Sequence, residues 1–169
     1  MSTVAFVGLG SNLAHPRRQI ARAIAAIARL HGTRIVARSP NYASAPVPKD
    51  AAQPDYVNAV VALRTALAPR SLLRRLQAIE RRQGRYRAIG MPRNSPRTLD
   101  LDLLLFGRRV MRLPQLTVPH PRMHERAFVL APLLDIAPAA TIPGRGLARR
   151  ERRAVRGQRI ARTRSARPR

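Results

Sequence analysis

Two carboxylates stand two residues apart in an apolar stretch of this chain, in the run Arg97-Thr98-Leu99-Asp100-Leu101-Asp102-Leu103-Leu104-Leu105-Phe106. Alternate side chains of a β-strand share a face, so Asp100 and Asp102 would point one way and their leucine neighbours the other. Adjacent carboxylates repel one another, and a divalent cation such as Mg²⁺, which prefers oxygen ligands, would hold them together. With the cation of Arg97 nearby, the pattern favours chemistry on a nucleotide triphosphate. An edge strand with two solvated aspartates would have the same spacing.

The composition indicates one globular domain with a strongly basic surface. Among 169 residues, 33 Lys and Arg stand against 8 Asp and Glu, which gives a formal net charge of +25 and favours anionic partners. The chain has no cysteine, so disulfides and thiolate chemistry are excluded. We find no run of about 18 apolar residues and no signal-peptide pattern. We therefore expect a monomer in the cytoplasm, without membrane association.

The positive charge is concentrated near the C-terminus. Residues 144–169 hold eleven arginines and one acid, Glu151, with few large apolar side chains and no clean amphipathic period. Such a segment can bury little surface. We expect a folded domain over residues 1–143, followed by a poorly ordered, arginine-rich tail that is dispensable for catalysis and contacts nucleic acid nonspecifically.

A glycine-rich segment follows the first β-rich run, residues 3–9. Its sequence, Gly8-Leu9-Gly10-Ser11-Asn12, lacks the third glycine of a dinucleotide-binding motif and the Gly-Lys of a P-loop. We interpret it as a tight turn between a strand and a helix, in which the Ser or Asn side chain caps backbone or contacts a ligand.

Hydrophobic periodicity predicts two amphipathic helices among five or six strands. Pro16 and Pro69 suit first helical turns, and isoleucines and leucines recur at helical spacing after each. Because the strands do not alternate strictly with helices, we predict an α+β fold with a mostly antiparallel sheet and helices packed on it. Besides the strand of the two aspartates, strands are expected at 3–9, 34–39, 41–44, 56–63 and 110–113, and helices at 16–31, from 69, and within 122–134.

A loop rich in glycine, proline and arginine lies between the second helix and the aspartate strand. It spans Gly84 to Pro96 and contains Arg85, and Arg97 follows it directly. A connection of this length is often functional, and we interpret it as a lid over phosphates.

Six short segments occur in order between Val4 and Pro143: Gly10-Ser11-Asn12-Leu13, Gln53-Pro54-Asp55-Tyr56-Val57-Asn58, Glu80-Arg81-Arg82-Gln83-Gly84-Arg85, Pro96-Arg97-Thr98-Leu99-Asp100-Leu101-Asp102, Thr117-Val118-Pro119-His120, and Arg126-Ala127-Phe128-Val129-Leu130-Ala131-Pro132-Leu133. The fourth is highly specific by itself. Together they resemble the 6-hydroxymethyl-7,8-dihydropterin pyrophosphokinase family of folate biosynthesis.

The resemblance implies a ferredoxin-like fold and transfer of pyrophosphate from ATP to the pterin's hydroxymethyl oxygen, with AMP leaving. It implies that Asp100 and Asp102 hold two Mg²⁺ ions and act in catalysis with Arg85 and Arg97. The implied ATP-binding residues are Gln77, Glu80, Arg85, Arg97, Thr117, His120 and Arg126. The implied pterin-binding residues are Ser44, Ala45, Val47, Tyr56, Asn58 and Phe128, with Tyr56 and Phe128 on the two faces of the ring.

Other interpretations of these residues stay open. Tyr56 or Phe128 alone could belong to the core, and His120 alone could cap a turn. Family members often have Trp-Gly, Arg and Tyr where this chain has Asn94-Ser95, Gln115 and Pro121. A relative with impaired catalysis is one alternative, and a nucleic-acid-binding protein is another, although the chain has only three Phe, three Tyr and no Trp for stacking on bases.

Overall fold

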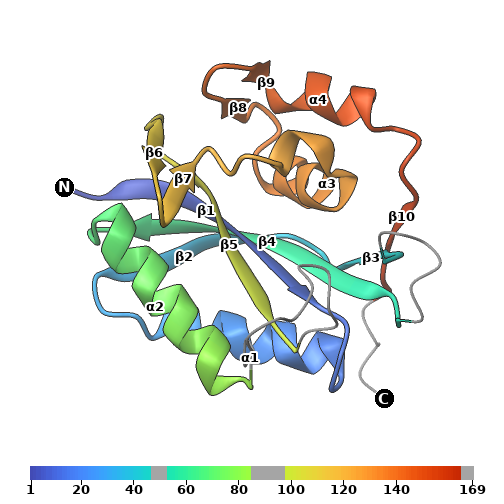
Figure 1. The fold of residues 1–169 in the computed structure, drawn as a ribbon, viewed down its shortest axis with the longest axis horizontal. Helices are drawn as coiled ribbons and strands as arrows, with labels where there is room; N and C mark the ends of the chain where they lie inside the picture. Colours follow the sequence, from blue (N-terminus) through green and yellow to red (C-terminus); the bar gives the residue numbers. More distant parts are fainter. Residues whose placement is uncertain (47–52, 85–97, 165–169) are drawn as a thin grey trace.

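The computed structural model describes residues 1–46, 53–84 and 98–164, which form a layered α+β fold (Figure 1). The two repeating units β1-α1-β2 and β4-α2-β5 interleave, so that antiparallel strands lie in the order β5-β1-β4-β2. This is the order of a ferredoxin-like fold, which confirms the predicted class. The elements are β1 (Thr3–Ser11), α1 (Pro16–Ala28), β2 (Thr33–Arg38), β4 (Tyr56–Thr65), α2 (Pro69–Arg82) and β5 (Asp100–Phe106).

Helices α1 and α2 cover one face of the sheet, as the periodicity predicted. Each begins with a proline, whose fixed backbone angle suits a first turn. Their apolar stripes are buried: Ile20 and Ile27 on α1 and Leu72 and Leu76 on α2 are fully inaccessible. These side chains pack against alternate residues of the central strands in the larger of two apolar clusters.

Helix α3 (Ala127–Ile136) covers the other face of the sheet (Figure 1), and a second apolar cluster lies beneath it. This helix packs mainly on β4, and the single-turn 3₁₀ helix η1 (Met123–Glu125) precedes it. The smaller elements around these layers are strand β3 (Tyr42–Ser44), hairpin β6 (Met111–Leu113) with β7 (Leu116–Val118), and hairpin β8 (Thr141–Ile142) with β9 (Gly146–Leu147).

Strand β1 continues through the glycine segment, which differs from the predicted turn. Gly8 and Gly10 lie within the strand and pair with residues of both β4 and β5, and β1 ends at Ser11. Strand β1 has a neighbour on both sides from Ala5 to Gly10, so cross-strand pairing overrides the low strand propensity of glycine.

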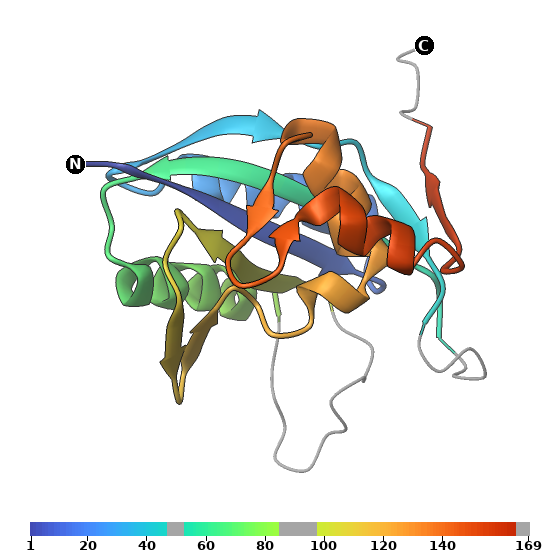
Figure 2. The ribbon, with the colours of Figure 1, turned by 90° about the horizontal axis from the view of Figure 1, so that it is seen from above.

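The C-terminal segment also differs from the sequence-based expectation. Residues 148–154 form helix α4 (Ala148–Ala154), which packs on α3, and strand β10 (Ile160–Arg162) pairs with β3 (Figures 1 and 2). The expectation of poor order is therefore wrong for residues 144–164, and the packed unit extends beyond residue 143. Ala148 is fully buried, and Asp135 of α3 forms an ion pair with Arg162 and accepts a hydrogen bond from Tyr42. Polar contacts, the small residue Ala148 and the partly buried Val155 hold the segment.

Candidate functional site

The two aspartates lie on β5 as their spacing predicted. Asp100 and Asp102 are half-buried, whereas Leu101 and Leu103 between and beyond them are buried in the larger apolar cluster. Within the described residues, strand β5 is an edge strand that pairs with β1 alone in the sheet. The carboxylates therefore occupy the sheet face opposite α1 and α2, the same face that α3 covers farther along.

The cross-strand register connects this carboxylate pair to β4. Asp100 lies opposite Gly10 of β1, which on its other side lies opposite Asn58 of β4. Residues directly opposite in an antiparallel pair share a face, so Asn58 and the aspartates face the same way, with only glycine hydrogens between them. Adjacent strands are spaced by about 4.8 Å, so the Cα atoms of Asn58 and Asp100, two strands apart, are separated by about 10 Å. Gly10 has no side chain to fill the space between them, and we call this space the glycine lane; Gly8, by contrast, is covered by the Leu104 side chain, which would lie 3.4 Å from a Cβ there.

A side chain at position 10 would obstruct this lane. A Cβ atom there would lie 3.3 Å from Oδ1 of Asn58, closer than an ordinary van der Waals contact. Gly10 is a functional candidate that the sequence did not identify, because its position between Asn58 and Asp100 depends on the register of three strands.

The predicted pterin residues of β3 and β4 are brought together. Asn58 is buried and donates a hydrogen bond from Nδ2 to Oγ of Ser44, at 2.8 Å. Ser44 pairs with Tyr56 across the two strands. The Tyr56 hydroxyl donates to Oε1 of Gln53, which also accepts from Nδ2 of the buried Asn12. This small network fixes the start of β4 against the end of β1.

Phe128 and Arg126 lie at the N-terminus of α3. Arg126 is the residue that precedes the helix, and its guanidinium carbon lies 5.7 Å from the centre of the Phe128 ring. Phe128 is half-buried and packs on the second apolar cluster. The predicted ring-contacting aromatic and the predicted phosphate-binding arginine therefore come from one turn.

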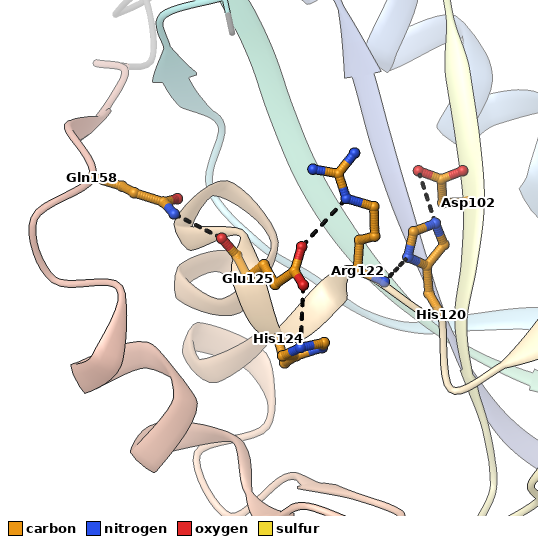
Figure 3. A network of polar contacts seen from close by, with 6 residues as sticks. All are labelled: Asp102, His120, Arg122, His124, Glu125 and Gln158. Carbon is orange, nitrogen blue, oxygen red and sulfur yellow. Dashed lines mark hydrogen bonds and ion pairs between the residues drawn. The ribbon is translucent and has the colours of Figure 1, made fainter. Parts of the chain in front are cut away.

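His120 lies beside the aspartates with a defined hydrogen-bond arrangement (Figure 3). The backbone N–H of Arg122 donates to Nδ1 of His120 at 3.2 Å, and Nε2 lies 4.0 Å from Oδ2 of Asp102. Burial and the neighbouring cations of Arg126 and Arg122 lower the pKa of His120 to about 4, against the opposing effect of Asp100. The imidazole is therefore neutral at pH 7, and because Nδ1 accepts, Nε2 carries the proton and directs it toward the carboxylates.

Glu80 has a contact that its predicted role did not include. Its side chain is buried, and Oε1 accepts a hydrogen bond of 2.7 Å from the backbone N–H of Leu101, the residue between the two aspartates. Glu80 therefore positions β5 from helix α2. Its contact with ATP stays a prediction. Gln77, one turn earlier on α2, is exposed.

The remaining predicted residues are distributed as follows. Thr117 is half-buried on β7, in the hairpin that leads to His120, and Ala45 is exposed directly after β3. Val47, Arg85, Arg97 and the predicted lid lie outside the described residues.

The carboxylate pair suits a magnesium site. Within residues 1–46, 53–84 and 98–164, no group of three or more His, Asp or Glu side chains has the geometry of a metal cage. Mg²⁺ is commonly held by one or two carboxylates, with water and substrate phosphates as the other ligands, and it needs no larger protein cage. Two carboxylates on one partly exposed face supply that donor set.

These features define a class of protein: an α+β domain with a ferredoxin-like strand order, whose sheet carries a carboxylate pair on one face, with a neutral histidine beside it and an arginine at the start of the helix that covers the same face. Comparison with known proteins identifies the family within this class. The family model described as 7,8-dihydro-6-hydroxymethylpterin-pyrophosphokinase matches residues 6–138. The chain belongs to this family.

Curated relatives agree with this assignment. The chain is 56% identical over 139 residues to 2-amino-4-hydroxy-6-hydroxymethyldihydropteridine pyrophosphokinase of Pseudomonas aeruginosa, covering 82% of this chain and 83% of that protein. It is 46% identical over 140 residues to the protein of the same name from Haemophilus influenzae, covering 82% and 84%. A solved structure of Plasmodium falciparum HPPK-DHPS shares the fold, with a TM-score of 0.69 and 14% identity, covering 91% of this chain and 44% of that one.

Proposed function

We propose that this chain transfers the pyrophosphoryl group of ATP to 6-hydroxymethyl-7,8-dihydropterin, in folate biosynthesis. The observation that carries the proposal is the placement of Asn58 and of the Asp100–Asp102 pair on one sheet face, across the glycine lane of β1. A flat bicyclic ring on the β4 side can reach the carboxylate side with its hydroxymethyl group. The names of the curated relatives support the same substrates.

The β4 side of the lane supplies the pterin contacts. The Asn58 amide offers both donors and an acceptor to the polar edge of the ring, and its bond to Ser44 holds it in place. Tyr56 and Phe128 provide aromatic surfaces for the two faces of the ring. Ala45 and Val47 complete the proposed pterin set.

The β5 side supplies the phosphate contacts. His120 donates a hydrogen bond from Nε2 to a phosphate oxygen without adding charge, and Arg126 supplies a cation. Arg85 and Arg97 are proposed as further catalytic cations, and Gln77, Glu80 and Thr117 as further ATP contacts.

Use of ATP implies a divalent metal ion, and we propose two Mg²⁺ ions held by Asp100 and Asp102. Bound there, the metal neutralises charge on the triphosphate and on the transferred group. The protein residues hold the hydroxymethyl oxygen and the β-phosphorus in line, so that catalysis depends on positioning and charge. In the reaction, the hydroxymethyl oxygen bonds to the β-phosphorus and loses its proton, and the bond from that phosphorus to the α-phosphate oxygen breaks to release AMP.

The test is AMP formation from ATP and Mg²⁺, followed by ³¹P NMR, with and without 6-hydroxymethyl-7,8-dihydropterin. We expect AMP and the pyrophosphorylated pterin in equal amounts, only when the pterin is present. Release of ADP, or AMP formation that does not depend on the pterin, contradicts the proposal.

The basic surface supports a weaker, nonspecific contact with nucleic acid. Arg149, Arg150, Arg153 and Arg156 are exposed on or just after α4. Such binding depends on counterion release and should weaken steeply as salt is raised.

No helix in the described part of the chain is long and apolar enough to cross a membrane. We propose that the enzyme works as a monomer in the cytoplasm, where ATP is supplied.

A further inference from the structure

We propose that Gln158, in the C-terminal segment, is a positioning residue that fixes Arg126 for binding of the ATP phosphates. This inference rests on the proposed function for the identity of the ligand. Its structural basis is a pair of hydrogen bonds between Gln158 and the turn that begins α3. Figure 3 shows the one to Glu125.

The Gln158 side chain binds the backbone on both sides of Arg126, and we call this pair of hydrogen bonds the bracket. Its Oε1 accepts a hydrogen bond of 2.8 Å from the N–H of Ala127, and its Nε2 donates one of 2.7 Å to the carbonyl of Glu125. Both peptide groups that flank Arg126 are thus bound to one side-chain amide. Such a two-point contact restricts the backbone on both sides of the arginine more than a single bond would.

The bracket gives a hydrogen-bond acceptor to a backbone N–H at the start of α3. The first N–H groups of a helix have no partner within the helix, and a side chain at the capping position usually accepts from one of them. Arg126 occupies the capping position and forms no such bond through its own side chain. Gln158, 32 residues later in the chain, provides the acceptor for Ala127.

The position of Gln158 is fixed from both sides. Before it, α4 packs on α3, with Ala148 fully buried, and the N–H of Gln158 itself donates to the carbonyl of Val155. After it, β10 pairs with β3, and Arg162 forms an ion pair with Asp135. The loop that carries the Gln158 amide is therefore held at both ends, by α4 and by β10.

The turn that begins α3 is also connected to His120, through Arg122. Arg122, whose backbone N–H bonds Nδ1 of His120, also forms an ion pair through its guanidinium with Glu125, at 3.3 Å. Figure 3 shows the continuous series of contacts from Gln158 through Glu125 and Arg122 to His120 and Asp102. Phe128, by contrast, is held by the apolar cluster. Loss of the bracket should therefore affect phosphate binding more than pterin binding.

The experiment compares Gln158→Met, Gln158→Glu and the control Arg159→Met in the full chain. Methionine keeps the length of the side chain and loses both hydrogen bonds, whereas glutamate keeps an acceptor for Ala127 and loses the donor to Glu125. Because each net hydrogen bond changes an equilibrium by about threefold to tenfold, we expect Gln158→Met to raise KM for ATP about five- to tenfold. KM for the pterin should change less than about twofold.

Two measurements do not depend on turnover. Calorimetric titration with a non-hydrolysable ATP analogue and Mg²⁺ should show the same loss of affinity, and amide exchange at Ala127 should accelerate in Gln158→Met. Gln158→Glu should retain protection at Ala127, and Arg159→Met should match the wild type throughout.

Three outcomes overturn the proposal: unchanged Ala127 exchange in Gln158→Met, unchanged affinity for the ATP analogue, or an equal rise in the KM values of both substrates. If the wild-type chain forms no AMP, the proposed function fails. Analogue binding and Ala127 exchange then still decide whether Gln158 positions Arg126.

Discussion

Substitution of Glu80 by alanine should destabilise the protein and slow catalysis by a single mechanism. The Glu80 side chain is buried, and it accepts a hydrogen bond of 2.7 Å from the Leu101 N–H, which is itself buried. A hydrogen bond to a charged group contributes about 1.5–3 kcal/mol, and an unsatisfied buried N–H costs a similar amount. Since these describe the same lost contact, we expect Glu80→Ala to lower the free energy of unfolding by about 2–3 kcal/mol. Glu80→Gln, which keeps a neutral acceptor, should lose about 1 kcal/mol.

Urea unfolding at neutral pH without ligands measures the stability change. The midpoint should fall in the order wild type, Glu80→Gln, Glu80→Ala, with an unchanged m-value. Arg74→Ala, at an exposed position of the same helix, is the control and should stay within about 0.5 kcal/mol of wild type. Because Leu101 separates the two aspartates, kcat should fall in the same order as stability.

Two results would refute this reasoning. One is a stability of Glu80→Ala within about 0.5 kcal/mol of wild type, which would mean that the bond to Leu101 contributes little. The other is a loss of ATP affinity with unchanged stability, which would mean that Glu80 acts only through the ATP contact that the family resemblance implies.

Four further predictions concern the site and the C-terminal segment. Asp102→Asn should reduce AMP formation by about 10³-fold or more, because metal-held charge contributes several kcal/mol, with little change in ligand-free melting temperature; a near-normal rate contradicts the metal assignment. The pKa of His120 is about 4 in the folded protein and 6.5 when unperturbed, so the unfolded state binds more protons between these values, and stability should fall by about 3 kcal/mol as the pH decreases through this window. His120→Gln should flatten that part of the urea-midpoint profile against pH, and an unchanged slope refutes the assignment. Deletion of residues 145–169 should lower the melting temperature by many degrees because α4 and β10 are lost, and a wild-type melting temperature would show that these contacts contribute little. Gly10→Ala should raise KM for the pterin about tenfold by displacing Asn58, with a smaller effect on kcat, and an unchanged KM argues against the glycine lane.

The parts of the fold that local patterns determine were predicted from the sequence. Isoleucines at helical spacing after Pro16 mark α1, and they are buried as expected. Alternation around Asp100 and Asp102 assigned both carboxylates to one face of a strand, and β5 confirms it. In each case the relevant period lies within one element, so the sequence contains the information.

The C-terminal segment could not be predicted in this way. Helix α4 buries Ala148 fully but has little other apolar surface, so its sequence has no strong hydrophobic period. Its position depends on partners distant in the chain, above all Asp135 and Tyr42, which bind Arg162. A run of arginines is typical of a solvated tail, and only the tertiary fold distinguishes an anchored arginine from the others.

The direction of Glu80 and the conformation of the glycine segment were unpredictable for a related reason. The bond of Glu80 and the pairing of the glycine segment both depend on which backbone groups the tertiary fold brings next to them. Helical spacing correctly places Glu80 near Gln77, but its bond to Leu101 follows from the packing of α2 on β5. Gly8 and Gly10 resemble a turn in sequence because the pairing of β1 on both sides is not encoded in the segment itself.

At the end of the sheet that carries Gly10, the two faces divide apolar packing and chemistry between them, while farther along α3 covers a second apolar cluster on the chemical face. Alternate residues of β1, β4 and β5 bury apolar side chains under α1 and α2, while the intervening residues present glycine, Asn58 and the aspartates to the other side. The α1–α2 face therefore sets the strand register, and the register sets the distance between the pterin and phosphate contacts. A large-to-small change such as Leu101→Ala should consequently impair both stability and activity, although its side chain points away from the substrates. Changes on the open face at Asp102 should affect activity alone, because that side chain supports no apolar packing.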